Sequence, residues 1–223
     1  MLFRSGNYGL IAIIHEVGHS LGLNHPGNYN GGSPTYLKNA LYAQDTRQYT
    51  VMSYFDASNS GANHGGYFAS TPLLHDIAAL HRMYGADMTI RTGDTVYGFN
   101  STADRVVYNF AVNANPILCI WDAGGTDTID VSGFGTNQVI DLREGAFSNV
   151  GNLTKNLSIA FGCAIENATG GSGHDSMMGN ALNNVLRGGG GNDLLNGERG
   201  NDSLFGGAGD DAFVVDSAGD TVS

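Results

Sequence analysis

The chain has few cationic residues, few prolines and few cysteines, and each shortage excludes a class of protein. Its 223 residues carry 10 Lys and Arg against 21 Asp and Glu, a formal net charge of -11, which argues against binding to nucleic acid or to an anionic membrane surface. Four prolines are too few for a proline-rich linker. No apolar run approaches the roughly 20 residues of a membrane span. The N-terminus also lacks the basic and long apolar regions of a Sec-type signal peptide.

The two cysteines, Cys119 and Cys163, lie in segments that we expect to be strands. A cysteine in such a segment is usually a small buried apolar residue. A disulfide is the alternative if the two strands are neighbours, and it depends on a distance that the sequence does not contain. Neither cysteine is near a base or in a metal-ligand pair, so neither is a candidate nucleophile.

One run, HEVGHSLGLNH, carries most of the chemical information. On a helix, His15 and His19 lie on the same face, because positions four apart are neighbours there. Glu16 follows the first ligand directly, and Gly22 can adopt the backbone conformation that ends the helix and brings His25 round as a third nitrogen ligand. Three protein ligands with one open position are typical of catalytic zinc.

The extended motif, with its glycine and third histidine, resembles the metzincin metalloproteases. Pro26 after His25 resembles the serralysin branch, as does the segment that holds Met52 and Tyr54. The resemblance implies one catalytic Zn²⁺ held by His15, His19, His25 and, at rest, Tyr54. It implies that Met52 forms the apolar floor of the site, a feature called the Met-turn.

The resemblance also implies the roles of the catalytic residues in peptide-bond hydrolysis. Glu16 is expected to act as the general base towards a zinc-bound water. Tyr54 is expected to leave the metal and donate a hydrogen bond to the oxyanion. The substrates would be proteins or peptides.

Helical periodicity is confined to the first part of the chain. We expect a zinc helix whose apolar back faces a core, and a second helix that has Thr71 as its capping residue and Pro72 in its first turn and ends at Gly85. His64 lies in a loop between them and is expected to be exposed. The residues expected on the apolar back of the zinc helix are Leu10, Ile13, Ile14, Val17 and Leu21.

After residue 86 the pattern changes to short alternating strands between Gly, Asp and Asn clusters. We therefore expect an α+β protein with a partial zinc metalloprotease domain in residues 1–89 and an all-β calcium-binding roll or sandwich in 90–223. Expected core positions of the first strands are Val106, Tyr108, Ile117, Ile120, Ile129, Val131, Ile140 and Leu142.

A nine-residue period begins at Gly170, and three of its five blocks match G-G-x-G-x-D-x-U-x, the calcium-binding RTX repeat. In each block six residues turn and three form a strand whose inward residue is the eighth. Two blocks make one turn of a parallel β-roll, so calcium is expected between loops two blocks apart. The eighth residues are Met177, Leu186, Leu195, Leu204 and Phe213.

Several Ca²⁺ ions are expected along the two edges of the roll, bound by glycine carbonyls and sixth-position aspartates. The second row begins poorly, because Asn180, Leu182 and Asn184 replace the expected residues, and we expect weaker binding there. The first row would use Gly171, Gly173, Asp175, Gly188, Gly189, Gly191, Asp193, Gly206 and Asp211, and the second row Gly197, Gly200 and Asp202.

Two earlier segments resemble serralysin calcium sites, and ordinary acidic turns are the alternative. One segment would offer carbonyls and the other carboxylates, with Glu166 completing a neighbouring ion. Their residues are Arg91, Gly93 and Thr95 in the first segment, and Asp122, Gly124, Gly125 and Asp127 in the second.

By comparison with serralysins we expect a chain that is cut at both ends, without the N-terminal part of the protease domain and the C-terminal secretion region. Two functions follow: a secreted, extracellular zinc endopeptidase stabilised by calcium, or a truncated, non-catalytic calcium-binding module. The resemblance further implies a monomer, with proteinaceous protease inhibitors and a type I secretion apparatus as partners.

Overall fold

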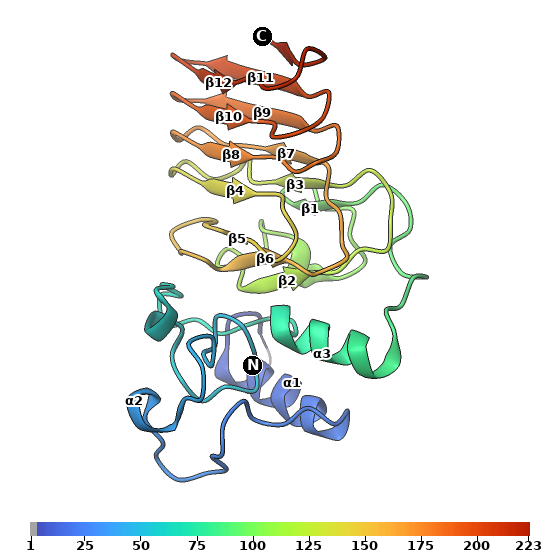
Figure 1. The fold of residues 1–223 in the computed structure, drawn as a ribbon. Coiled ribbons are helices and arrows are strands. Elements are labelled where there is room, and N and C mark those ends of the chain that lie inside the picture. Colours follow the sequence, from blue (N-terminus) through green and yellow to red (C-terminus); the bar gives the residue numbers. More distant parts are fainter. Residues whose placement is uncertain (1–3) are drawn as a thin grey trace.

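The computed structural model describes residues 4–223, which form an α+β structure with the helices at one end and a stack of strands at the other (Figure 1). The α+β expectation is therefore confirmed. The helices are α1 (Tyr8–Ser20), α2 (Tyr36–Asn39) and α3 (Leu74–Tyr84), with short 3₁₀ turns at Ala57–Ser60 and Val106–Tyr108.

The strands form a six-stranded sheet in the order β1-β3-β7-β9-β11-β13, a four-stranded sheet in the order β12-β10-β8-β4, and a three-stranded sheet in the order β2-β6-β5. All the strand pairs are parallel except β5 with β6. The strands are β1 (Val96–Gly98), β2 (Leu118–Ile120), β3 (Thr128–Asp130), β4 (Val139–Asp141), β5 (Phe147–Ser148), β6 (Leu157–Ile159), β7 (Asn167–Thr169), β8 (Ser176–Met178), β9 (Val185–Gly190), β10 (Leu194–Asn196), β11 (Ser203–Ala208), β12 (Ala212–Val214) and β13 (Thr221–Val222).

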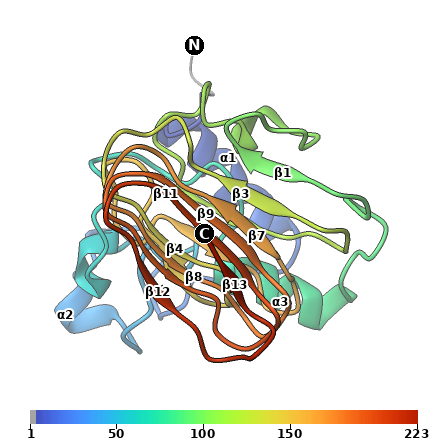
Figure 2. The ribbon, with the colours of Figure 1, turned by 90° about the horizontal axis from the view of Figure 1, so that it is seen from above.

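From β8 to β13 successive strands alternate between the two larger sheets, so that the chain winds as a roll seen end-on in Figure 2. The register confirms the expected repeat, because Leu195 pairs with Met177 and Leu204 pairs with Leu186. Both pairs join residues two blocks apart. The eighth residues line the interior: those of the first four blocks are at most 1% exposed, and Phe213 is partly buried against them.

The expected core positions of the earlier strands are buried with one exception, Val106, which is 63% exposed. Val106 opens a 3₁₀ turn instead of a strand, and the period of two that predicted its burial does not apply in such a turn. Cys119 and Cys163 are buried and free, so the disulfide does not form. Burial raises the pKa of each thiol to about 12, which is consistent with two inert apolar residues.

The expected apolar back of α1 is correct only in part, because Ile14 packs against a buried cluster and Leu10 is partly buried, whereas the other three residues are exposed. Ile13, Val17 and Leu21 are all more than two fifths exposed. The face that packs is instead that of Ile11 and Gly18, because a Cβ on Gly18 would lie 2.7 Å from the Met52 sulfur. The close approach of Met52 therefore decides which side of the helix is buried.

The start of α3 and the exposure of His64 also differ from expectation. Leu73, and not Thr71, is the N-cap, and its N–H donates to the Asp76 carboxylate at 2.9 Å. The Thr71 hydroxyl instead accepts a hydrogen bond from the Cys119 N–H of β2 at 3.1 Å. His64 is only 9% exposed and contacts the Lys155 carbonyl at 3.3 Å, because its loop packs against the β5–β6 connection. Among residues 4–223 no helix is long and apolar enough to cross a membrane.

Candidate metal sites

Three imidazoles converge beside the C-terminal half of α1. His15 and His19 come from the helix, and His25 comes from the loop after Gly22, whose φ of 90° makes the turn. The Nε2 atom of His25 lies 3.1 Å from the Nε2 atom of His15 and 3.1 Å from that of His19. In the described part of the chain, these three form the single group of acidic, thiol or imidazole side chains close enough to hold one metal ion.

Backbone carbonyls determine which ring nitrogen of each histidine is free. The Nδ1 atoms of His15, His19 and His25 lie 2.8, 2.9 and 2.7 Å from the carbonyls of Val51, Leu23 and Tyr29. A carbonyl only accepts, so each Nδ1 carries the proton and each Nε2 presents a lone pair. Burial also lowers the pKa of His25, which favours its neutral form.

This arrangement fits a tetrahedral zinc ion. Three lone pairs that face one another without a proton between them repel, and a cation at their centre removes that repulsion. Tetrahedral ligands about 2.0–2.1 Å from zinc would be separated by about 3.3 Å, close to the 3.1 Å between the Nε2 atoms. The nitrogen donors, their protonation and their spacing all suit the ion that the motif implies.

Glu16, Tyr54 and Met52 lie around the three histidines. Glu16 is exposed, and it lines an open cleft together with the histidines and Tyr54. The Tyr54 ring centroid is 4.6 Å from that of His25 and 5.9 Å from that of His15. Met52 is 2% exposed and packs under α1. All the residues predicted for this site are thus brought together.

A residue that the sequence did not predict, Asp45, ties the parts of this site to one another. It is fully buried, and its Oδ1 accepts hydrogen bonds from the Tyr29 hydroxyl and the Ser53 hydroxyl, both at 2.7 Å. The Tyr29 carbonyl orients His25, and Ser53 precedes Tyr54. Burial, together with the neighbouring carboxylate, raises the pKa of Tyr29, which keeps its hydroxyl a donor.

The sixth-position carboxylates of the roll lie in a regular ladder. Asp193 Oδ1 accepts from the Asp175 N–H at 2.8 Å, Asp211 Oδ1 from the Asp193 N–H at 2.9 Å, and Asp202 Oδ1 from the Asn184 N–H at 2.8 Å. The Oδ2 atoms of Asp193 and Asp202 are buried without a partner. A buried carboxylate oxygen without a donor is costly, and a cation beside it would remove that cost.

Asp175 differs from these because both of its oxygens are used within the chain. Its Oδ1 accepts from the Gln138 N–H at 2.7 Å and its Oδ2 from the Gly171 N–H at 2.8 Å. The Gly171 carbonyl also accepts a bond from the Gly190 N–H at 2.9 Å. Both carboxylate oxygens of the first block are therefore already engaged by N–H donors of the chain.

The glycines of the blocks allow the loops to stack. Gly189 and Gly191 have φ of 105° and 107°, which non-glycine residues rarely adopt, and a Cβ on either would collide with a carbonyl of the loop two blocks earlier. Gly200 has φ of 142° and lies against the Leu182 carbonyl. The carbonyls that lie in the same way against a glycine of another loop are those of Gly171, Gly173, Gly188, Gly189, Gly191, Gly197 and Gly206.

The two earlier candidate segments lie side by side. A Cβ on Gly125 would lie 2.6 Å from the Gly93 carbonyl. Asp127 Oδ1 accepts from the Thr95 N–H at 2.7 Å, its Oδ2 has no partner, and its own N–H donates to Glu166 at 2.7 Å. Burial, together with nearby acids, raises the pKa of Asp127 to about 7. Gly124 lies beside them, with its N–H donating to Asp122 Oδ1 at 2.9 Å.

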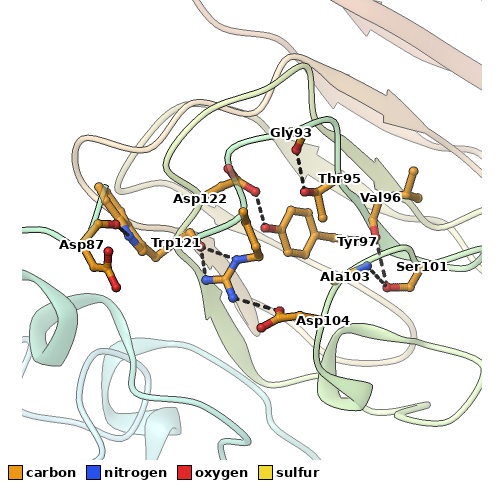
Figure 3. Close-up of polar contacts among 11 residues, drawn as sticks. Asp87, Gly93, Thr95, Val96, Tyr97, Ser101, Ala103, Asp104, Trp121 and Asp122 are labelled. Atoms are coloured by element: carbon orange, nitrogen blue, oxygen red, sulfur yellow. Dashed lines mark hydrogen bonds and ion pairs between the residues drawn. The ribbon is translucent and has the colours of Figure 1, made fainter. Parts of the chain in front are cut away.

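Figure 3 shows how some of these groups are already engaged. The Tyr97 hydroxyl donates to Asp122 Oδ2 at 2.5 Å, and the Thr95 hydroxyl donates to the Gly93 carbonyl at 2.9 Å. The Arg91 guanidinium donates to Asp104 and to the Trp121 carbonyl, and the φ of Arg91 is 47°. The predicted carbonyls of Gly93 and Thr95 accept bonds within the chain as well, the latter from the Thr128 N–H at 2.9 Å.

A roll of parallel strands with eighteen residues a turn, joined to a three-histidine centre, defines the class of protein as a β-roll repeat protein. Residues 86–223 match the family described as Peptidase M10 serralysin C terminal. The chain therefore belongs to this family.

Individual relatives agree with that assignment. Metalloprotease AprA of Pseudomonas entomophila (strain L48) is 54% identical over 190 residues, which are 82% of this chain and 39% of that protein. Serralysin of Proteus mirabilis is 55% identical over 185 residues, 81% of this chain and 37% of that protein. Serralysin B of Dickeya chrysanthemi is 52% identical over 175 residues, 77% of this chain and 36% of that protein. The chain thus spans less than two fifths of the length of these relatives.

Proposed function

We propose that this chain carries the zinc-binding and calcium-binding parts of a secreted endopeptidase that hydrolyses peptide bonds of extracellular proteins. The observation that carries the proposal is the convergence of the Nε2 atoms of His15, His19 and His25, with every Nδ1 proton donated to a carbonyl. Membership of the serralysin family supports it.

The residues of the chain have separable roles in this reaction. A zinc ion bound by the histidines would supply a Lewis acid and a water of lowered pKa. Glu16, exposed in the cleft, would accept a proton and pass it to the leaving amine. Tyr54 would be a ligand at rest and a hydrogen-bond donor to the developing oxyanion. Met52 would support the rings from below.

Calcium would stabilise the roll from its edges. The orphaned oxygens of Asp127, Asp193 and Asp202 support cation binding at those three places. The division into residues 1–89 and 90–223 is also a proposal: the family match begins at residue 86, whereas each hydrophobic cluster takes members from both sides. Inhibitors and a type I secretion apparatus remain predictions from the family.

A non-catalytic calcium-binding module is the second candidate function, favoured by the buried oxygens of Asp127, Asp193 and Asp202 that have no donor. Zinc content and casein hydrolysis of the calcium-loaded chain separate the two functions, with Glu16→Ala as the control. One zinc per chain with hydrolysis that Glu16→Ala abolishes supports the endopeptidase. Zinc without hydrolysis supports the module, and no zinc binding overturns the assignment of the three histidines.

A further inference from the structure

Asn180 and Asn184 lie where a calcium ion of the second row would be expected. The strand register places Asn184 one turn after Glu166 and one turn before Asp202, because Val185 pairs with both Asn167 and Ser203. Asn184 is 1% exposed. Glu166, Asn184 and Asp202 thus form a column across adjacent turns of the roll. Asn184 carries an amide in this column, and both of its neighbours are acidic.

Both amide groups donate hydrogen bonds from the first loop of this row to backbone carbonyls of earlier segments of the chain. Asn184 Nδ2 lies 2.7 Å from the Glu166 carbonyl, and Asn180 Nδ2 lies 2.8 Å from the Ile165 carbonyl and 3.2 Å from the Leu142 carbonyl. These carbonyls belong to segments that precede the repeats. In both amide groups a nitrogen donor, and not an oxygen, thus faces the carbonyls of the preceding segments.

The partners determine the orientation of each amide. Asn184 Oδ1 accepts from the Asn180 N–H at 2.8 Å, and Asn180 Oδ1 accepts from the Leu182 N–H at 2.9 Å. A third bond joins the two side chains, from Asn184 Nδ2 to Asn180 Oδ1 at 3.1 Å. Rotating either amide by 180° would place oxygen against carbonyl oxygen and nitrogen against an N–H, so the nitrogens must face the carbonyls.

We propose that these two amides replace a calcium ion, so that the first turn of the roll on this edge closes without metal. The next position in the same column shows the contrast, because Asp202 Oδ2 is buried with no donor. The proposal goes further than the weaker calcium binding expected at the start of this row, because it assigns a cation-free junction there. The place where the irregular β-structure meets the repeats would remain folded when calcium is removed, and the calcium-dependent turns would form against it.

The test is the single-atom change Asn184→Asp in the full chain. It exchanges the donor that faces the Glu166 carbonyl for an oxygen. The new carboxylate, the Glu166 carbonyl and Asn180 Oδ1 would then face one another and require a cation. Asn183→Asp is the matched control: Asn183 is exposed, and its Oδ1 already accepts from the Asn201 N–H at 2.8 Å, a bond that a carboxylate retains.

We expect Asn184→Asp to bind one more calcium ion per chain than the wild type in equilibrium dialysis, and Asn183→Asp to bind the same number. In EGTA, amide-exchange protection of Val185 and Asn167 should fall about tenfold or more in Asn184→Asp, since a buried polar group without a partner destabilises the folded state. An unchanged calcium count with unchanged protection would overturn the proposal.

A measurement on the wild type keeps the proposal testable even if the variant fails to fold. In EGTA, amides of Asn167, Ala168 and Val185 should stay protected while those of Leu204 and Phe213 exchange. Equal loss of protection along the whole roll would refute the cation-free junction. A different result would contradict the proposed calcium rows: they are wrong if the wild type binds no calcium at all.

Discussion

At the scale of single residues, the three-histidine centre depends on groups that never touch the metal position. Each histidine is oriented by a carbonyl, and two buried carboxylates hold segments that carry those carbonyls. Asp76 accepts from the Val51 N–H at 2.9 Å, and the Val51 carbonyl orients His15. Asp45 holds Tyr29, whose carbonyl orients His25. Both carboxylates are positioning residues, and the centre is therefore built outward from its ligands.

Asp45→Ala should lower zinc affinity about 10- to 100-fold, the usual effect of losing a group that orients a ligand. Asp45→Asn should retain most of the affinity, because a single oxygen accepts both hydroxyls and an amide oxygen can do the same. Competition with a chromophoric zinc chelator measures both, and calcium-dependent melting is the control for folding of the roll. Equal losses in the two variants, or none in either, would show that Asp45 does not position His25 and Tyr54.

The predictability of these residues follows from how local their interactions are. The ligands were predictable because an i, i+4 pair, a glycine and a third histidine lie within eleven consecutive residues. Asp45 was not, because its two partners lie 16 and 8 residues away and only the folded loops bring them together. Asn180 was recognised as a departure from the repeat, but its donor role depends on a carbonyl 15 residues earlier.

At the scale of elements, the nine-residue repeat predicted the strands of the roll well. The helical periodicity predicted the buried face of α1 less well. In a block, the alternation of a strand leaves one residue that must face the interior, so Leu195 and Leu204 could be placed from the period alone. On α1, five apolar residues suggested a buried stripe, yet Ile13 and Val17 are exposed. The burial of a helix face depends on which elements pack against it, and here that is the segment of Met52.

Neighbouring leucines in β10 provide a direct test of this inward–outward alternation. Leu195 is fully buried, whereas the adjacent Leu194 is 45% exposed. Leu195→Ala should cost about 2–5 kcal/mol in the free energy of unfolding, as for other large-to-small core changes, and Leu194→Ala about 0.5 kcal/mol or less. Denaturant unfolding in saturating calcium measures both. Similar costs for the two variants would contradict the strand register.

At the scale of the whole molecule, the roll concentrates negative charge in a way that opposes folding when no cation is present. Asp127, Asp175, Asp193 and Asp202 each have a pKa raised above the ordinary value, in every case chiefly by burial. Nearby acids raise three of them further, Asp175 being the exception. The excess of acidic residues along the chain thus becomes, after folding, a set of carboxylates that favour either a proton or a metal ion.

The stability of the chain in EGTA and the additional stability on binding calcium should therefore depend on pH in opposite senses. A carboxyl whose pKa is raised by folding binds its proton more tightly in the folded state, so its contribution is fully present below the unfolded value of about 4. That contribution is lost as pH rises through the folded value, about 7 for Asp127. In EGTA the melting temperature of the roll should fall across this interval. Calcium requires the ionised form, so the rise in melting temperature on adding calcium should grow across the same interval.

The histidines act in the other direction, because burial lowers the pKa of His25, His64, His75 and His81 and favours folding as pH rises. The calcium-dependent difference in melting temperature, measured at each pH, cancels the contribution of the histidines because calcium does not change that contribution.

Asp127→Asn is the matched variant: its amide oxygen can still accept from the Thr95 N–H, but the group no longer titrates. It should flatten the fall in EGTA and reduce the pH dependence of the calcium effect. A calcium-dependent difference that is constant between about pH 4 and pH 7 would show that the carboxylate ladder does not bind the ions, and the orphaned oxygens would need another explanation.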